Sequence, residues 1–170
     1  MKWFISCLLT GAILFQQSSC KEDPPKPLTE LEKLPPETKI GKRTFGCLIN
    51  GKAFVPNSTS DVSAVFQQGI LQISGAIDYP LHWVGISLIE NGDILRTGIY
   101  NLTSPPYQEA RCYYAECYYY EEHTTEGSVA LTLFDKVNYI ISGTFDFTTV
   151  APGCDTLSVT DGRFDIKYVP

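Results

Sequence analysis

The chain has 170 residues, with 13 basic and 19 acidic side chains and a formal net charge of −6. From Thr44 onward there are six basic and fourteen acidic residues, a net charge of −8, which repels phosphate and argues against nucleic acid as a partner. The 127 residues from Thr44 to Pro170 suit one domain with a sizeable core.

The first nineteen residues are predicted to be a signal peptide that is removed. Met1-Lys2 is a short positive region, and Trp3 to Phe15 is an uncharged apolar run that ends at Gln16. A membrane-spanning helix needs about 20 apolar residues, so this run is too short. The ending Ser18-Ser19-Cys20 resembles the lipobox of bacterial lipoproteins, although Gln17 stands where that family usually has Leu, Val or Ile.

The lipobox resemblance implies that Cys20 receives a diacylglyceryl group and becomes the new N-terminus; the alternative is an ordinary secretory signal with Cys20 as a bystander. Lys21-Glu22-Asp23 follows directly and resembles the export signal of Bacteroidota surface lipoproteins. That resemblance implies an outer-membrane protein facing the medium. The alternative for these three residues is a solvated charge cluster in a tether.

Residues 20–43 are predicted to be the lipid anchor followed by a Pro-rich linker. Residues 21–43 contain five prolines, six basic and five acidic side chains, a composition that cannot bury enough apolar surface to fold alone. Thr29 and Glu32 have the spacing of a capping box, so a helical turn is expected before Pro35-Pro36. If the rest is extended, this linker spans up to about 70 Å.

Residues 44–170 are predicted to be strands almost throughout, because apolar residues alternate with polar or small ones. The alternating sets are Phe45, Cys47 and Ile49; Leu71, Ile73 and Ile77; Val84, Ile86 and Leu88; Val129, Leu131 and Leu133; and Ile141, Phe145 and Phe147. Asn50-Gly51 and Asn91-Gly92 each separate two such runs and predict type I′ hairpins. The expected fold is therefore an all-β antiparallel sandwich of about eight or nine strands, with a small barrel as the alternative.

The last strand changes parity. Leu157 and Val159 are odd-numbered, whereas Phe164, Ile166 and Tyr168 are even-numbered, so an extra residue has to be absorbed between the two sets. Asp161-Gly162 is the expected β-bulge, with Gly162 at positive φ.

Motifs at both ends of the mature chain carry a family resemblance. They are Leu34-Pro-Pro-Glu-Thr, Thr44-Phe-Gly-Cys-Leu-Ile-Asn-Gly-Lys-Ala-Phe-Val-Pro, Ile141-Ser-Gly-Thr-Phe-Asp-Phe and Val159-Thr-Asp-Gly-Arg-Phe-Asp-Ile-Lys-Tyr. Together they are similar to an uncharacterised family of Bacteroidota surface lipoproteins. The resemblance implies the same all-β fold and a cell-envelope setting, and it carries no established activity.

Four cysteines remain in the domain once Cys7 and Cys20 are set aside. An even number in an oxidising compartment predicts two disulfides, for which three connectivities are open. We favour Cys112–Cys117, which closes a short loop, and Cys47–Cys154, which joins the first strand to the last turn. A zinc site is the rival interpretation, but it needs a tighter set of thiolates or histidines, so no metal and no cofactor is expected.

Catalytic signals are weak. His82 and His123 lie far apart in the sequence, and no serine lies in a Gly-x-Ser-x-Gly elbow. Asp146 and Asp165 could converge as a glycosidase pair, but acids that alternate with buried aromatics are more often the solvated face of a sheet.

Tyrosines are concentrated between residues 112 and 123. Five of the ten tyrosines fall within eight residues: Tyr113, Tyr114, Tyr118, Tyr119 and Tyr120. In a strand at most about half of them can enter the core, so the others are expected to stay partly exposed. They predict a site for stacking on a glycan or anchoring a protein partner, with Glu116, Glu121 and Glu122 as polar contacts. The alternative is that tyrosine is here simply a good strand former.

The predicted function is thus a lipid-anchored, surface-exposed binding or cell-envelope structural module of unknown ligand. The alternative from a different class is a lipid-anchored hydrolase that acts on polysaccharide.

Overall fold

The computed structural model describes residues 26–90, 94–104 and 107–170. Cys20, Lys21, Glu22 and Asp23 lie outside the described residues, as does the predicted Asn91-Gly92 turn. The strands are β1 (Thr44–Ile49), β2 (Lys52–Phe54), β3 (Val62–Gln67), β4 (Ile70–Asp78), β5 (Leu81–Ile89), β6 (Gly98–Asn101), β7 (Thr103–Ser104), β8 (Gln108–Tyr114), β9 (Cys117–Tyr119), β10 (Thr124–Asp135), β11 (Ile140–Thr149) and β12 (Leu157–Lys167). Single 3-10 turns are η1 (Leu31–Lys33), η2 (Thr59–Asp61) and η3 (Glu121–His123).

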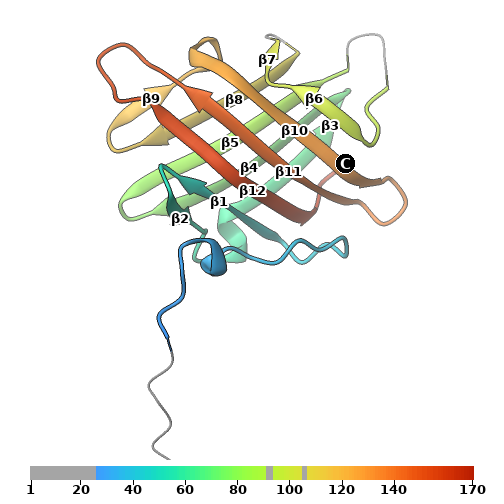
Figure 1. Cartoon of the computed structure of the whole chain (residues 1–170). Coiled ribbons are helices and arrows are strands. Elements are labelled where there is room, and N and C mark those ends of the chain that lie inside the picture. Colours follow the sequence, from blue (N-terminus) through green and yellow to red (C-terminus); the bar gives the residue numbers. More distant parts are fainter. Residues whose placement is uncertain (1–25, 91–93, 105–106) are drawn as a thin grey trace, which may run out of the picture.

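The strands form two antiparallel sheets packed face to face (Figure 1). The first sheet has the order β2-β1-β12-β11-β10-β6, and the second has the order β3-β4-β5-β8-β7, with β9 also paired to β8. The predicted sandwich is confirmed and the barrel alternative is wrong. The described residues contain more strands than expected because β2, β7 and β9 have only two or three residues each, too few to show an alternating pattern.

The core lies between the sheets and is built from one side of every long strand. Phe45 of β1 packs against Phe145 of β11, with ring centroids 5.2 Å apart, and Leu71, Ile73, Val84, Ile86 and Leu88 enter from the second sheet. These are the residues that the alternation predicts. Leu133 is an exception, because a register shift between Leu131 and Leu133 turns Phe134 toward the core instead.

The turns and bulges follow backbone rules that the sequence shows only in part. Asn50 and Gly51 have φ of 48° and 76°, so the predicted type I′ hairpin is confirmed. The register of β11 with β12 shifts between Phe145 and Phe147, which confirms a bulge beside Asp161. The positive φ, however, belongs to Asp161, at 53°, and not to Gly162. Gly162 is needed for another reason: a Cβ there would come within 2.5 Å of the Phe145 ring.

The segment before β1 is docked on the sandwich. We call residues 29–43 the strap; Figure 1 shows it in blue at the lower end of the sandwich. The capping box is confirmed, because the Glu32 amide donates to Thr29 Oγ1 at 3.3 Å and the Thr29 amide donates to Glu32 Oε2 at 2.7 Å. Glu30 accepts a hydrogen bond from the Ala53 amide of the edge strand β2 at 2.8 Å, and Leu34 is buried. From Thr29 onward the linker is therefore not a free spacer.

The carboxylate of Asp165 ties the strap to the first sheet. It points outward from β12 yet is only 1% exposed, because the strap covers it. It accepts hydrogen bonds from Thr38 Oγ1, from the amides of Ile40, Gly41 (2.7 Å) and Lys42, and from Ser142 Oγ (2.8 Å). Burial acts to raise the pKa of Asp165, but these hydrogen bonds outweigh it and hold the pKa below its usual value. The expectation of a solvated Asp165 is thus wrong.

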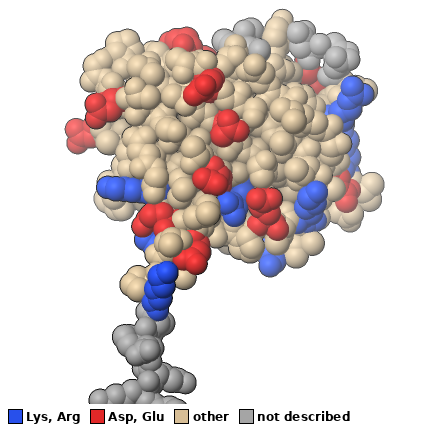
Figure 2. Space-filling view, viewed as in Figure 1, with Lys and Arg blue, Asp and Glu red and all other residues tan. Residues whose placement is uncertain are grey.

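Charged side chains of both signs are interspersed on the outer face of the first sheet (Figure 2). Among the described residues, no helix is long and apolar enough to cross a membrane.

We expect Asp165→Asn to destabilise the fold by about 2–4 kcal/mol, because an amide presents N–H groups to the strap amides that now donate to the carboxylate. Since the pKa of Asp165 is depressed in the fold, its stabilisation is present above the unfolded pKa of about 3.9 and is lost as the pH falls through the folded pKa. Chemical denaturation across pH checks both effects. The matched control is Asp146→Asn, exposed on β11, which should change stability by less than about 0.5 kcal/mol. Equal stability of the two variants would contradict the role of Asp165.

Candidate functional site

The tyrosine-rich stretch forms a tight hairpin. β8 and β9 are joined by Ala115 and Glu116, which have φ of 49° and 65°. The register pairs Tyr114 with Cys117, Tyr113 with Tyr118 and Cys112 with Tyr119. Because side chains alternate across each strand, this register sends Tyr113 and Tyr118 to one side of the sheet and their neighbours to the other.

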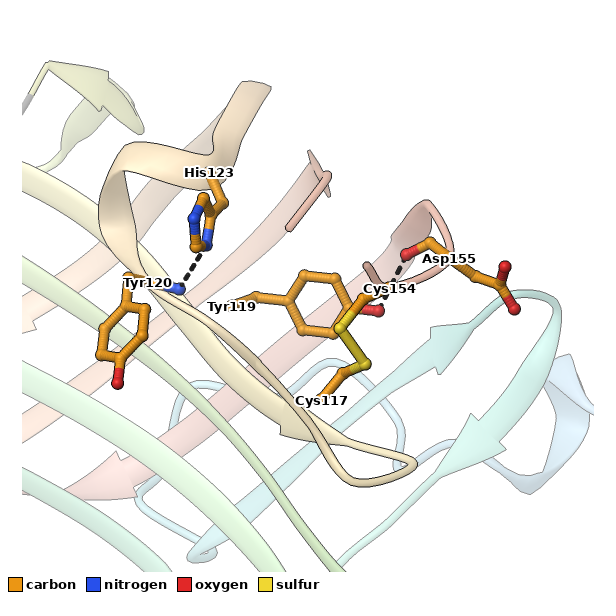
Figure 3. The surroundings of a disulfide bond; sticks show 6 residues. All are labelled: Cys117, Tyr119, Tyr120, His123, Cys154 and Asp155. Carbon is orange, nitrogen blue, oxygen red and sulfur yellow. Dashed lines mark hydrogen bonds between the residues drawn. A yellow bond between two sulfur atoms is a disulfide. The ribbon is translucent and has the colours of Figure 1, made fainter. Parts of the chain in front are cut away.

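Two of the five tyrosines face the core. Tyr119 is 3% exposed and its hydroxyl donates to the Asp155 carbonyl at 2.8 Å, while Tyr114 packs against the core beside His82. Tyr118 and Tyr120 are 43% and 48% exposed, with ring centroids 4.4 Å apart. Figure 3 shows Tyr119 and Tyr120 on opposite sides of the strand. The prediction that at most about half of the tyrosines enter the core and that the others stay partly exposed is confirmed.

The disulfide pairing differs from the one we favoured. Cys117 bonds to Cys154 (Figure 3). Cys47 and Cys112 are free and buried. Cys112–Cys117 is excluded because the two-residue hairpin places Cys112 opposite Tyr119, so the two cysteines lie on a diagonal about 7–8 Å apart. Cys47–Cys154 is excluded because Cys154 lies in the β11–β12 loop beside the tip of the hairpin, whereas Cys47 lies in the core. The observed bond holds the hairpin against that loop.

The free thiols are inert at neutral pH. Burial raises the pKa of Cys112 to about 12, and burial together with the neighbouring Cys112 raises the pKa of Cys47 further. Thiols with such pKa values carry almost no thiolate. Within the described residues, no group of three His, Cys, Asp or Glu side chains is placed to hold a metal ion.

An aromatic rank crosses the outer face of the second sheet. Ala76 pairs with Trp83, Trp83 with Tyr113, and Tyr113 with Tyr118, so these residues stand in line across β4, β5, β8 and β9. Tyr120 extends the line by its contact with Tyr118. The residues Ala76, Leu81, Trp83, Tyr113 and Tyr118 line an open, apolar hollow of about 410 Å³.

Trp83 is folded down onto the sheet. A Cβ at Gly85 would come within 2.4 Å of Trp83 Cζ2 and 2.6 Å of Cη2, so the indole lies over Gly85 where no other residue would leave room. One side of the ring is therefore packed against its own strand and the side chain is half-buried. The glycine therefore leaves the space that the indole occupies against the strand.

A polar rank runs beside the aromatic one. Arg111 stands opposite Gly85, and Glu109 opposite Ser87. Arg111 Nη2 donates to Glu109 Oε2 at 2.6 Å, and Nε lies 2.8 Å from Glu121 Oε2 of η3. Glu109 is 6% exposed although it faces outward. Burial acts to lower the pKa of Arg111, but the charges of Glu109 and Glu121 outweigh it and raise that pKa, so the guanidinium stays charged.

The two ranks meet at Trp83. The hollow beside Arg111 has about 190 Å³ and is lined by polar side chains of Gln72, Ser74, Ser87, Glu109 and Arg111 together with Trp83. Enclosed small-molecule sites usually have on the order of 300–1,000 Å³, so this one suits a ligand that lies across the surface. Of the predicted polar contacts, Glu121 belongs to this face, whereas Glu116 and Glu122 are exposed beside the hairpin.

Sequence reasoning missed Trp83, Glu109 and Arg111. A signal was present for Trp83, because Val84, Ile86 and Leu88 assign the even positions of β5 to the core and so turn Leu81 and Trp83 outward. Glu109 and Arg111 could not be placed, because the start and parity of β8 are not evident from its residues.

Asp146 and Asp165 do not form a catalytic pair. Ser142 stands opposite Asp165, and Asp146 lies four residues farther along β11, which places the two acids about 13 Å or more apart. Glycosidase carboxylates are separated by about 5–10 Å. Asp165 is moreover buried under the strap, and its carboxylate is hydrogen-bonded to the strap and to Ser142.

Removing the disulfide should destabilise the fold by about 2–4 kcal/mol, because the bond closes a long loop across a sequence separation of 37. The double variant Cys117→Ser/Cys154→Ser, compared with its parent by denaturation with and without reductant, checks this. Reductant should weaken the parent and leave the double variant unchanged. A peptide map of the non-reduced protein that links Cys112 to Cys117 would overturn the pairing.

Comparisons with known proteins place the domain in a family. A search of curated proteins and a search of solved structures each gave no match. One family model, described as a domain of unknown function (DUF6252), matches residues 44–166, which is nearly all of the sandwich. The chain belongs to this DUF6252 family.

Proposed function

We propose that the protein is a surface-exposed outer-membrane lipoprotein that acts as a binding module, with the outer face of the second sheet as its binding face. The observation that carries this proposal is the aromatic rank of Trp83, Tyr113, Tyr118 and Tyr120 on the solvent side of that sheet. Contiguous exposed aromatic surface is uncommon on a protein without partners and usually marks an interaction site.

The chemistry of the face supports binding. Tryptophan, tyrosine and arginine are the residues that most often dominate binding energy, and here all three lie within two neighbouring ranks. The hairpin is held by its short turn and by Cys117–Cys154, so the tyrosines lose little freedom when a partner docks. A face that is already ordered binds at a lower entropic cost.

The anchor and the strap together limit how far the domain extends from the membrane. If Cys20 carries the lipid and Thr29 is docked, only the eight residues 21–28 lie between them, and the chain from Cys20 to Thr29 spans at most about 30 Å. This is less than half of the reach expected for a free linker of residues 20–43. The domain is thus held near the outer leaflet, where envelope glycans and proteins are within reach.

Loss of the aromatic rank should abolish capture of partners. Photo-crosslinking on intact cells compares the parent with Trp83→Ala and with Tyr118→Ser/Tyr120→Ser, each first checked for an unchanged melting temperature. Crosslinked products should fall at least about 10-fold in both variants. The control is Ile99→Ser, an exposed apolar residue on β6 of the other sheet, which should leave capture unchanged. Unaltered capture by stably folded Trp83→Ala protein would contradict the proposal.

The anchor is tested separately. Cys20→Ala should eliminate metabolic labelling with a fatty acid, because Cys20 is the proposed acyl acceptor. Proteinase added to intact cells should digest the parent, since Lys21-Glu22-Asp23 is proposed to direct it to the outer leaflet. Label retained by the Cys20→Ala protein, or a parent that resists proteinase on intact cells, would refute this part of the proposal.

A further inference from the structure

We infer that the ligand of this face is a neutral glycan chain that lies across the strands of the second sheet. The inference rests on the proposed function and adds the class of ligand. Three features of the two ranks carry it: their direction, their pairing of ring surface with hydrogen-bonding groups, and their charge.

The direction of the aromatic rank suits an extended chain. Trp83, Tyr113 and Tyr118 stand on successive strands, so the rank runs perpendicular to the strands and covers about 10 Å from Trp83 to Tyr118. This is the length of a disaccharide unit, and Tyr120 extends it further. The hollows on either side of Trp83 are shallow or small, so a chain can lie over them but a compact molecule is not enclosed.

The pairing of surfaces matches a sugar ring. A hexose has a face of C–H groups that stacks on an aromatic ring and an edge of hydroxyls that needs donors and acceptors. Trp83 supplies the ring surface, held down over Gly85, and the neighbouring rank supplies Gln72, Ser74, Ser87 and Arg111. A purely hydrophobic protein anchor would leave this adjoining polar rank without partners.

Arg111 is prepared to donate. Its guanidinium has five N–H donors in a fixed fork. Nη2 donates to Glu109, whereas the buried Nε lies 2.8 Å from Glu121 in an ion pair but without hydrogen-bond geometry. Within the described residues, no protein acceptor pairs with Nη1. The carboxylates hold the guanidinium beside the hollow, and the Arg111 side chain is 41% exposed, so its remaining donors are accessible to a ligand.

The charge of the site selects a neutral ligand. Glu109 and Glu121 together outweigh Arg111 by one negative charge, and the domain carries a net charge of −8 from Thr44 onward. A uronate, sulfate or phosphate group would be repelled here. Neutral hydroxyls can donate to the carboxylate oxygens and accept from the guanidinium.

The test is tryptophan fluorescence on the full chain in a Trp3→Phe background, where Trp83 is the only tryptophan. The probes are neutral hexasaccharides (cellohexaose, laminarihexaose, mannohexaose, xylohexaose and chitohexaose), with heparin and polygalacturonate as polyanions. At least one neutral probe should change the emission of Trp83 with a dissociation constant in the micromolar to millimolar range, and neither polyanion should do so. Calorimetry provides the second readout.

Variants assign the binding to the two ranks. Tyr118→Ala should weaken binding of the responding probe about 3- to 10-fold, because a stacking contact is lost. Arg111→Lys keeps the positive charge but loses the forked guanidinium. If this variant binds the probe more weakly by a similar factor, the guanidinium hydrogen bonds contribute to binding. Ile99→Ser should bind normally. If Trp83→Ala fails to fold, Trp83→Phe, which keeps an aromatic ring, takes its place. Because the Trp83 variants lack the fluorophore, their binding is measured by calorimetry.

The outcomes separate the two proposals. If no neutral probe gives a fluorescence or calorimetric response at millimolar concentration, or if a polyanion binds instead, the glycan inference is overturned. Partner capture on cells that still depends on Trp83 would then show a binding face for a protein ligand. Capture that is independent of Trp83 overturns the proposed function itself.

Discussion

The alternation of side chains across a β-strand is the constraint on which this structure depends. Each long strand sends one set of side chains into the shared core and the other outward, and a strand of either sheet cannot bury both. Phe45, Phe145 and Phe147 meet Leu71, Ile73 and Val84 between the sheets. What distinguishes the two sheets is therefore what lies on their outward sides.

The outward sides are used differently. On the first sheet the strap covers part of the surface, and it is held there because Asp165, an outward carboxylate, gathers hydrogen bonds from Thr38 and the amides of Ile40 to Lys42. On the second sheet no described segment covers Trp83, Tyr118 and Tyr120. The strap thus shortens the free part of the linker, and the uncovered sheet presents an ordered aromatic and polar surface.

Period-two patterning was sufficient to predict the fold class and most of the core. It failed where the backbone departs from a regular strand. At the register shift in β10, Phe134 faces the core where the alternation predicts Leu133, because a bulge changes which residues face inward and no glycine marks it in the sequence. Asp161, and not Gly162, adopts positive φ. The glycine is required for a different reason, because a Cβ at position 162 would collide with the Phe145 ring. The disulfide could not be predicted because it depends on the register of a hairpin whose turn, Ala115-Glu116, has no usual turn residues.

The sequence predicted the tyrosines of the candidate site but not the residues from neighbouring strands. The tyrosines were found from their density in the sequence, but their division between core and surface had to come from the β8–β9 register. Trp83, Gly85 and Arg111 come from strands that the tyrosine-rich stretch does not include, and pairing across strands brings them together. Such a constellation is set by strand order, which sequence spacing does not contain.

Hydroxyl-radical footprinting tests the central claim most directly, because it needs no knowledge of the ligand. Oxidation of each residue is measured by mass spectrometry on intact cells that display the protein and on the purified protein. The account predicts that Trp83, Tyr118 and Tyr120 are protected on cells, whereas Tyr139, exposed in the β10–β11 loop, is oxidised equally in both. Equal oxidation of Trp83, Tyr118 and Tyr120 in the two samples would contradict the assignment of this face as the binding surface.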